Sequence, residues 1–398
     1  MKKLFVLLLA ALMLCACALA SAEMTKEEIQ TLFDSEMHEA RYITQRGKAY
    51  EYEPFQRYLS FWFQKVWSVT DYKKIPITDV ENAEEILTTL RSLREQLVQV
   101  VDDPESVAWY IWGESMPQAA GAYAYDYTCA YDEAGFKPFL VPYMLEDQSA
   151  VKGNIVIVAG GAFNQRCNDN EGDPVAVYWN GRGYNCFILQ RRVAPSESID
   201  SSLDLARAIR YLRANAEEKG IAKPETIITM GFSGGGMTIL NQLNTCYGDL
   251  TPDVVYSDYV PDDIDRINAD YPVAVIMYGT KDGYDSENPN MPALFLFGGE
   301  IDNKVSPLYV VDLYTTAINK GWPVEMYMAG ETHHGIGVAG VRAFSNVGYT
   351  NALGYLDVLD TYLDTKLGYK PVTFTPCACV PVCDPATCTC EGCVTAGF

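Results

Sequence analysis

The sequence predicts an α/β protein in which a mostly parallel sheet is flanked by helices. From residue 154 onward, short continuous apolar runs alternate with amphipathic segments at helical spacing. Strands that are covered on both faces carry such runs, and alternating strands and helices give an open parallel sheet. The 398 residues, 48% hydrophobic and 21% charged, suffice for one large folded domain with appendages and exclude a wholly disordered chain.

The first 22 residues have the three parts of a secretory signal peptide. Lys2 and Lys3 precede an apolar run over residues 4–20, and residues 20–22 form a small-x-small cleavage site. Two alternatives stay open. The run is close to the shortest length that spans a bilayer, so it could be a retained anchor, and Cys17 could be lipidated. We expect a secreted protein, with membrane contact only if Cys17 carries a lipid.

The charge of the exported chain excludes some partners. Removing Lys2 and Lys3 reduces the 30 basic residues to 28 against 52 acidic ones, so the net charge moves from −22 to −24. Such a surface repels phosphate backbones and anionic membranes. We therefore expect no nucleic-acid partner, whereas neutral substrates such as carbohydrates suit the charge.

The 12 cysteines form three groups: Cys15 and Cys17 in the predicted signal peptide, four in the body of the chain and six near the C-terminus. Six lie in a tail over residues 371–398, namely Cys377, Cys379, Cys383, Cys388, Cys390 and Cys393. In an exported protein a dense, even cluster favours disulfides, although the C-x-C and C-x-x-C spacings would also suit a thiolate metal site. Four prolines between residues 371 and 385 stop helices there, so we treat the tail as separate.

Residues 23–115 are predicted to form a helical N-terminal region. Thr25 followed by Glu27 and Glu28 indicates a helix start, and apolar residues recur at helical spacing over residues 80–101. Eight aromatic side chains between residues 50 and 67 allow two interpretations, a surface that stacks on sugars or helical packing against the main domain.

Residues 116–370 are predicted to form the main domain. Alternation over residues 123–131 predicts a strand, with residues 136–145 as its hairpin partner. Apolar runs predict further strands over residues 154–159, 184–190, 226–230, 272–278, 293–297 and 324–328. Helices are predicted over residues 173–180, 202–218, from 234, 307–320 and 352–366.

Gly231-Phe232-Ser233-Gly234-Gly235 is a G-x-S-x-G element between a predicted strand and a predicted helix. A serine on so tight a turn exposes its hydroxyl, and the flanking glycines leave the room that the turn needs. A nucleophilic serine requires a base and an orienting acid, which follow it in the chain in this architecture. Ser233 is therefore the candidate nucleophile.

The candidate base and acid lie on loops that follow later strands. His334 is preferred over His333 because Gly335 after it leaves space, while His38 lies before the serine. Asp302 directly follows the apolar run 293–297 and is the preferred acid. Glu300 and Asp282 remain alternatives for the acid.

Backbone N–H groups are needed to stabilise the developing oxyanion. Gly234, at the start of a helix, and the glycine loop over residues 159–163 are the candidates. The sequence has no P-loop lysine motif, no strand-linked G-x-G-x-x-G and no H-E-x-x-H. The chemistry proposed for Ser233 needs no cofactor and no metal.

Four ordered segments resemble a known family. VAGGAF at 158–163, GYNCFILQRRVAP at 183–195, ARAIRYLRANAEEKGI at 206–221 and GFSGGG at 231–236 resemble secreted esterases of the α/β-hydrolase superfamily, in the acetyl-xylan and feruloyl-esterase-like branch. The resemblance implies Ser233, Asp302 and His334 as a catalytic triad. It further implies Gly161, Ala162 and Gly234 as oxyanion donors, although Ala159, Ala162 and Gly234 depart from the commoner residues of the branch.

We therefore expect an exported serine esterase that removes acetyl or feruloyl groups from plant polysaccharides. A serine peptidase of the same fold and a non-catalytic surface or binding protein on a hydrolase frame are the alternatives. The resemblance covers neither residues 23–115 nor the cysteine-rich tail.

Overall fold

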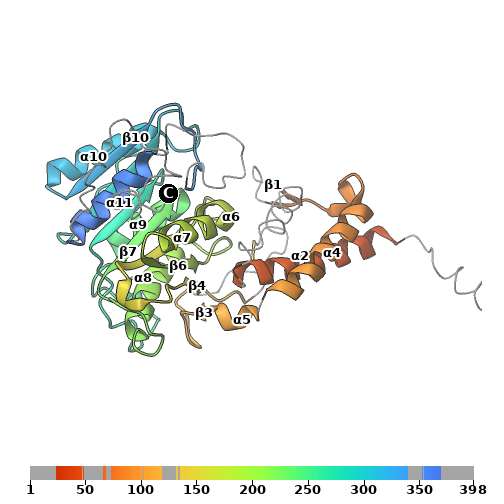
Figure 1. Ribbon diagram of the computed structural model, residues 1–398. Coiled ribbons are helices and arrows are strands. Elements are labelled where there is room, and N and C mark those ends of the chain that lie inside the picture. Colours follow the sequence, from red (N-terminus) through yellow and green to blue (C-terminus); the bar gives the residue numbers. More distant parts are fainter. Residues whose placement is uncertain are drawn as a thin grey trace, which may run out of the picture.

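The computed structural model describes residues 24–46, 48, 66–68, 73–101, 103–118, 131–132, 135–338, 352 and 354–368 (Figure 1). Several predictions lie outside these residues: the signal peptide with Cys17, the aromatic group over residues 50–63, most of the strand at 123–131, and the cysteine-rich tail. No helix among the described residues is long and apolar enough to cross a membrane.

Eight strands form the central sheet in the order β10-β9-β8-β7-β5-β6-β4-β3. All neighbouring pairs from β10 to β6 are parallel, and β4 is antiparallel to both β6 and β3. The predicted mostly parallel sheet is thus confirmed. The strands are β3 (Trp109–Tyr110), β4 (Phe139–Tyr143), β5 (Gly153–Val158), β6 (Tyr184–Gln190), β7 (Ile227–Phe232), β8 (Val273–Met277), β9 (Ala293–Gly299) and β10 (Val324–Ala329).

The predicted hairpin before β5 lies mostly outside the described residues, and only its second strand can be followed. Tyr131, the last residue of the predicted strand, lies in a bend. The partners of β4 among the described strands are β6, along its full length, and β3, through Phe139 and Leu140. Residues 109–110 thus occupy the start of the β4 edge opposite β6.

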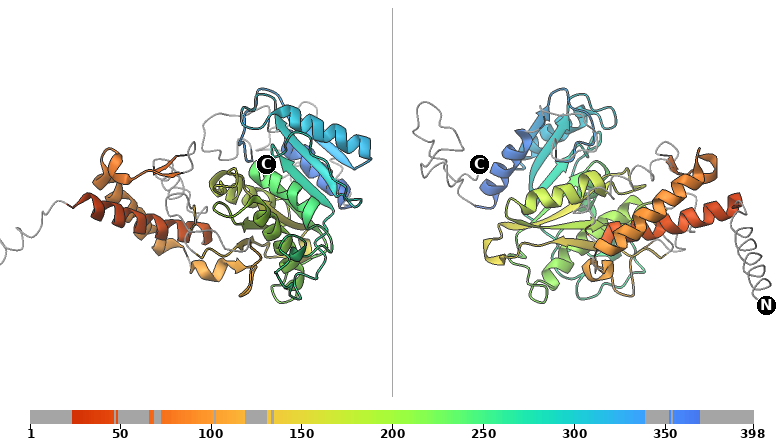
Figure 2. Two further views of the ribbon diagram at one scale, coloured as in Figure 1. Left: turned by 180° about the vertical axis from the view of Figure 1, so that it is seen from behind. Right: turned by 45° about the vertical axis from the view of Figure 1, so that its right-hand side comes forward.

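Helices cover both faces of the sheet (Figures 1 and 2). On one face, α7 (Asp173–Asn180) and α11 (Gly354–Lys366) form a core with the strand side chains that point toward that face. On the other, α8 (Ser198–Ala214), α9 (Gly234–Thr245) and α10 (Pro307–Lys320) share a second core. Because both faces of the strands are buried, their sequences read as continuous apolar runs.

Local signals determine where the helices begin and end. Ser306 caps α10 through its side chain, Pro307 follows it, and Gly321 ends the helix with a φ of 72°, so the predicted bounds 307–320 are confirmed. The predicted helix at 202–218 is shifted. A capping box between Glu197 and Asp200 starts α8 at Ser198, and turns replace the helix after Ala214.

The N-terminal region contains α2 (Lys26–Arg46), α4 (Ala83–Val100) and α5 (Pro104–Val107), so its predicted helical character is confirmed for the described residues. Thr25 and Glu28 form the capping box that starts α2. α2 and α4 pack on each other around their own apolar cluster and extend away from the sheet (Figures 1 and 2). The short β1 (Trp67–Ser68), β2 (Lys73–Lys74) and η2 (Ile77–Asp79) complete this region, while η3 (Gln148–Ala150) and η4 (Pro252–Val254) lie in the main domain.

Candidate active site

The serine turn lies between β7 and α9. Ser233 has φ 49° and ψ −120°, a conformation that is costly for a residue with a side chain. The surrounding packing holds it there: Ser233 N–H donates to the Met277 carbonyl at 2.9 Å. A Cβ on Gly235 would lie 1.9 Å from the Val158 carbonyl oxygen, so only glycine lets α9 start this close to β5. The turn presents Ser233 at the carboxyl edge of the sheet.

His334 joins Ser233 to Asp302. Its Nε2 lies 2.8 Å from Ser233 Oγ, and its Nδ1 lies 2.6 Å from Asp302 Oδ2. In this arrangement Nδ1–H donates to the carboxylate, which leaves Nε2 free to accept the serine proton. The structure thus brings together the three side chains that the sequence analysis selected, from the loops after β7, β9 and β10.

Asp302 is held as a carboxylate. Burial alone would raise its pKa, but hydrogen bonds from His334 and from the backbone N–H groups of Val305 and Lys304 outweigh this effect and lower the pKa. The two N–H groups bind Oδ1 at 3.0 and 2.8 Å, which leaves Oδ2 directed at His334. The carboxylate can therefore orient the imidazole.

The alternative residues lie elsewhere. His333 and Asp282 are exposed, and His38 is exposed on α2. Glu300 is also exposed, and its Oε2 accepts a hydrogen bond from the backbone N–H of Glu331 at 2.9 Å. The two ring nitrogens of His334 instead lie against Asp302 and Ser233.

The glycine loop after β5 faces the start of α9. Gly161, Ala162 and Phe163 all have positive φ, at 116°, 50° and 60°. A Cβ on Gly234 would lie 3.1 Å from Ala162 N, so the Ala162 and Gly234 backbones are adjacent. Two N–H groups on neighbouring loops next to a serine hydroxyl are what an oxyanion needs. Gly161 adjoins this pair in the same loop.

Two buried residues next to the site escaped the sequence analysis. Glu171, at the end of α6 (Asn168–Glu171), accepts hydrogen bonds from Gly160 N–H and from the Tyr278 hydroxyl, both at 2.8 Å. Burial raises the pKa of Glu171 despite these bonds. The Tyr278 ring packs edge-on against His334, with 4.7 Å between centroids. No motif marks either residue, because their partners are distant in the chain.

Arg192, within the segment that carries the family resemblance, has a structural role. Its guanidinium is buried and pairs with Asp204 at 2.7 Å and Asp200 at 3.3 Å. The Trp112 indole N–H also donates to Asp204, at 2.8 Å. This buried network ties the loop after β6 to α8 and does not expose the Arg192 charge.

Metal and thiol sites place further requirements on the described residues. No group of three or more His, Cys, Asp or Glu side chains there could hold a metal ion. Cys167, Cys186 and Cys246 are free thiols, and burial raises the pKa of each. Raised pKa values keep these thiols protonated and inert.

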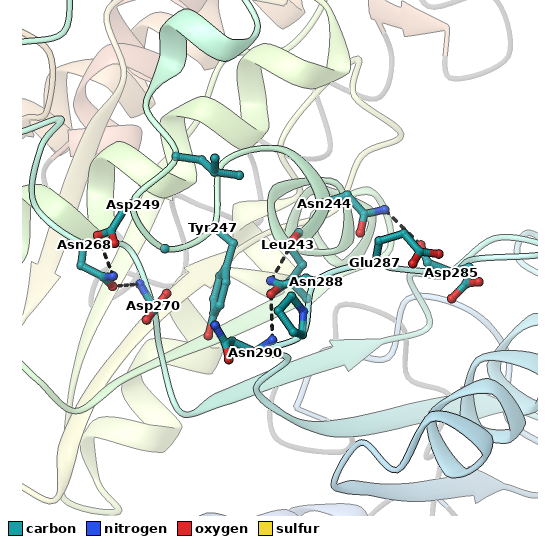
Figure 3. A pocket seen from close by; sticks show the side chains of 13 residues that line it. Leu243, Asn244, Tyr247, Asp249, Asn268, Asp270, Asp285, Glu287, Asn288 and Asn290 are labelled. Carbon is teal, nitrogen blue, oxygen red and sulfur yellow. Dashed lines mark hydrogen bonds between the residues drawn. The ribbon is translucent and has the colours of Figure 1, made fainter.

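The protein also contains a cavity of about 550 Å³, whose lining residues are shown in Figure 3. It is lined by residues that precede β8 and β9, including Asp270 and Asn290, and by Tyr247 after α9. These segments meet at the amino ends of the parallel strands, whereas Ser233, Asp302 and His334 follow the carboxyl ends. The cavity is therefore separate from the serine site.

No protein-family model matches the chain. A stretch of 115 residues is 32% identical to endo-1,4-beta-xylanase B of Butyrivibrio fibrisolvens, which covers 28% of this chain and 17% of that protein. The solved acetyl ester-xyloside bifunctional hydrolase of Caldicellulosiruptor lactoaceticus is 22% identical, with a TM-score of 0.49 over 63% of this chain and 96% of that one. Butyrate-bound esterase Est2 of Thermogutta terrifontis is 19% identical, with a TM-score of 0.45 over 58% and 91%.

The architecture of the chain itself assigns its fold. The sheet is parallel except for β4, the serine occupies a strained turn from strand to helix, and the acid and histidine follow it in that order after later strands. The chain has the α/β-hydrolase fold.

Proposed function

We propose that the protein is a serine hydrolase of carboxylic esters, with Ser233 as nucleophile, His334 as base and Asp302 as orienting acid. The hydrogen-bonded series from Ser233 through His334 to Asp302 carries the proposal. A serine hydroxyl is a weak nucleophile until a neighbouring base takes its proton. His334 Nε2 is within that reach, and a buried carboxylate orients its ring.

The reaction follows from these positions. Ser233 Oγ attacks the ester carbonyl carbon while its proton passes to His334 Nε2. The resulting tetrahedral oxyanion collapses, the bond to the alcohol oxygen breaks, and His334 returns the proton to the leaving alcohol. Water then attacks the acyl-enzyme in the same way, so that the carboxylic acid leaves and Ser233 regains its proton.

The oxyanion is held by backbone N–H groups of Ala162 and Gly234, with Gly161 as a third donor in the same loop. The adjacency of Ala162 and Gly234 supports this assignment. No hydrogen bond from the N–H of Ala162 or Gly234 appears among those of the described residues, so both are available to a substrate. Loss of one such donor costs about 3 kcal/mol in the transition state.

We assign acylated plant polysaccharide as the substrate class. We further propose that the protein is exported and acts outside the cell. The similarity of a 115-residue stretch to a protein named as a xylanase supports this substrate class, together with the strongly negative net charge, −22 for the full sequence, which suits a neutral polymer. The signal-like N-terminus supports secretion.

The test measures acyl release from p-nitrophenyl acetate and from acetylated xylan by wild type and Ser233→Ala. We expect release by wild type from both substrates and loss of release in the variant, with an unchanged circular dichroism spectrum. Release from the small ester alone would support the proposed esterase activity but refute acylated polysaccharide as the substrate. Equal release by both proteins would refute Ser233 as nucleophile, and hydrolysis of amide but not ester substrates would replace the esterase by a peptidase.

A further inference from the structure

Glu171 occupies a buried position between the two loops that carry the serine chemistry. The residue is 3% exposed, and the two hydrogen bonds that hold its carboxyl group come from neutral donors. Burying a carboxyl group costs free energy unless its oxygens are hydrogen-bonded. Oε2 accepts from Gly160 N–H and Oε1 accepts from the Tyr278 hydroxyl, so each oxygen binds a different loop.

The bond to Gly160 controls the oxyanion loop. Gly160 is held on both sides by one short segment, because its N–H donates to Glu171 and its carbonyl accepts from Cys167 N–H at 3.2 Å. The peptide that leads into Gly161 and Ala162 is therefore fixed in orientation. A Cβ on Gly160 would lie 2.6 Å from Glu171 Oε2 and 2.8 Å from Ser233 Cβ, which shows how closely these groups pack.

The bond to Tyr278 controls the histidine loop. The Tyr278 hydroxyl donates to Glu171 and accepts from Gly337 N–H at 3.1 Å, three residues after His334. Asn170, next to Glu171, donates to the Gly335 carbonyl at 2.7 Å. Tyr278 itself has φ 40°, a strained conformation that places its ring against His334.

We propose that Glu171 is a positioning residue which, through Gly160 on one side and Tyr278 on the other, fixes the oxyanion donors and His334 in register with each other. The inference rests on the proposed esterase function. Transition-state stabilisation depends on this register because donors and base must act on the same carbonyl group. Displacement by about 1 Å can cost 100-fold in rate.

The pattern of donors and acceptors makes the proposal specific. Two groups donate to Glu171, so a carboxylate satisfies both. Glu171→Gln keeps the shape but turns one acceptor into a donor. The new donor either faces the Gly160 N–H, which is itself a donor, or displaces the hydrogen bond that the Tyr278 hydroxyl donates. Tyr278→Phe removes the hydroxyl and keeps the ring beside His334. The Glu171 carboxyl group and the Tyr278 hydroxyl therefore form one hydrogen-bonded unit, and each of the two groups can be removed by its own substitution.

The experiment measures kcat and KM for p-nitrophenyl acetate in wild type, Glu171→Gln, Tyr278→Phe and the double variant. We expect kcat to fall about 10- to 100-fold in Glu171→Gln with KM within about twofold, because the loss concerns the transition state. The double variant should lose little more than Glu171→Gln alone, since both substitutions break the same unit.

Tyr143→Phe is the matched control. It removes another buried tyrosine–carboxylate hydrogen bond, from Tyr143 to Asp173 at 2.7 Å, only two residues along the chain from Glu171. We expect it to lower the unfolding temperature and leave kcat unchanged. Titration with a fluorophosphonate counts competent sites, so that kcat is expressed per folded molecule. If Glu171→Gln does not fold, kcat of the milder variant Tyr278→Phe tests the inference.

Two results would overturn the inference. The first is that Tyr278→Phe, and Glu171→Gln if it folds, have the same kcat per competent site as wild type. The other is a kcat loss no larger than that of Tyr143→Phe. Failure of the proposed esterase function gives a different result, because wild type would then release no more acyl product than Ser233→Ala.

Discussion

His334 Nε2 lies 2.8 Å from Ser233 Oγ although 101 residues separate the two in the chain. They meet because β7 and β10 are both parallel members of one sheet, so the loops after them open at the same edge. His333, the adjacent residue, is exposed. The pair of histidines therefore offers a test in which one substitution removes the base and its neighbour is the control.

His334→Gln should lower kcat for p-nitrophenyl acetate by about 10⁴-fold or more, since the serine loses its proton acceptor. His333→Gln should leave kcat within about twofold of wild type. Steady-state kinetics of the two variants checks this. The reverse order of effects would assign the base to His333.

Asp302→Asn should lower kcat by about 10⁴-fold with little change in KM, because an amide no longer selects the productive tautomer of His334. Glu300→Gln is the control: it keeps the length of the side chain and an acceptor for Glu331 N–H. Comparable losses in the two variants would show that the acid is not Asp302 alone.

Gly235→Ala should destabilise the protein by about 3 kcal/mol or more, because the new methyl group would overlap the Val158 carbonyl. Gly113→Ala is the matched control, since a Cβ there meets nothing within 4 Å. Urea unfolding of both variants measures the difference. Equal stability would mean that α9 can move away from β5 without cost.

Asp262 provides a pH-dependent contribution to stability. Bidentate hydrogen bonds from Arg207, at 2.6 and 2.8 Å, lower its pKa to about 2. A pKa below the unfolded value means that the carboxylate stabilises the fold above about pH 4 and loses this effect as the pH falls toward 2.

Asp262→Asn should therefore lower the melting temperature at pH 6, and the difference from wild type should shrink between pH 4 and pH 2. Asp263→Asn removes a carboxylate whose pair with Arg266 is exposed on both sides, and should have little effect at any pH. Melting curves at five pH values would contradict this account if the Asp262→Asn difference stayed constant.

The order of strands and helices could be predicted because its signals are local. The bounds 173–180, 184–190 and 307–320 agree with α7, β6 and α10, where apolar periodicity and residues such as Ser306 and Gly321 act within a few positions. The choice of Ser233 with an acid and a histidine behind later strands likewise needed only motif, order and spacing.

Contacts between distant segments could not be predicted in this way. The strand beside β4, the start of α8 and the link from Glu171 to Tyr278 across 107 residues depend on which groups meet when the sheet forms. Periodicity determines which side of a strand or helix is buried, but not what lies opposite it. The sequence by itself determined the elements and the three side chains proposed to act together, Ser233, His334 and Asp302. The tertiary structure decided how these side chains and loops are positioned relative to one another, because hydrogen bonds of about 2.8 Å between loops exist only after the strands have paired.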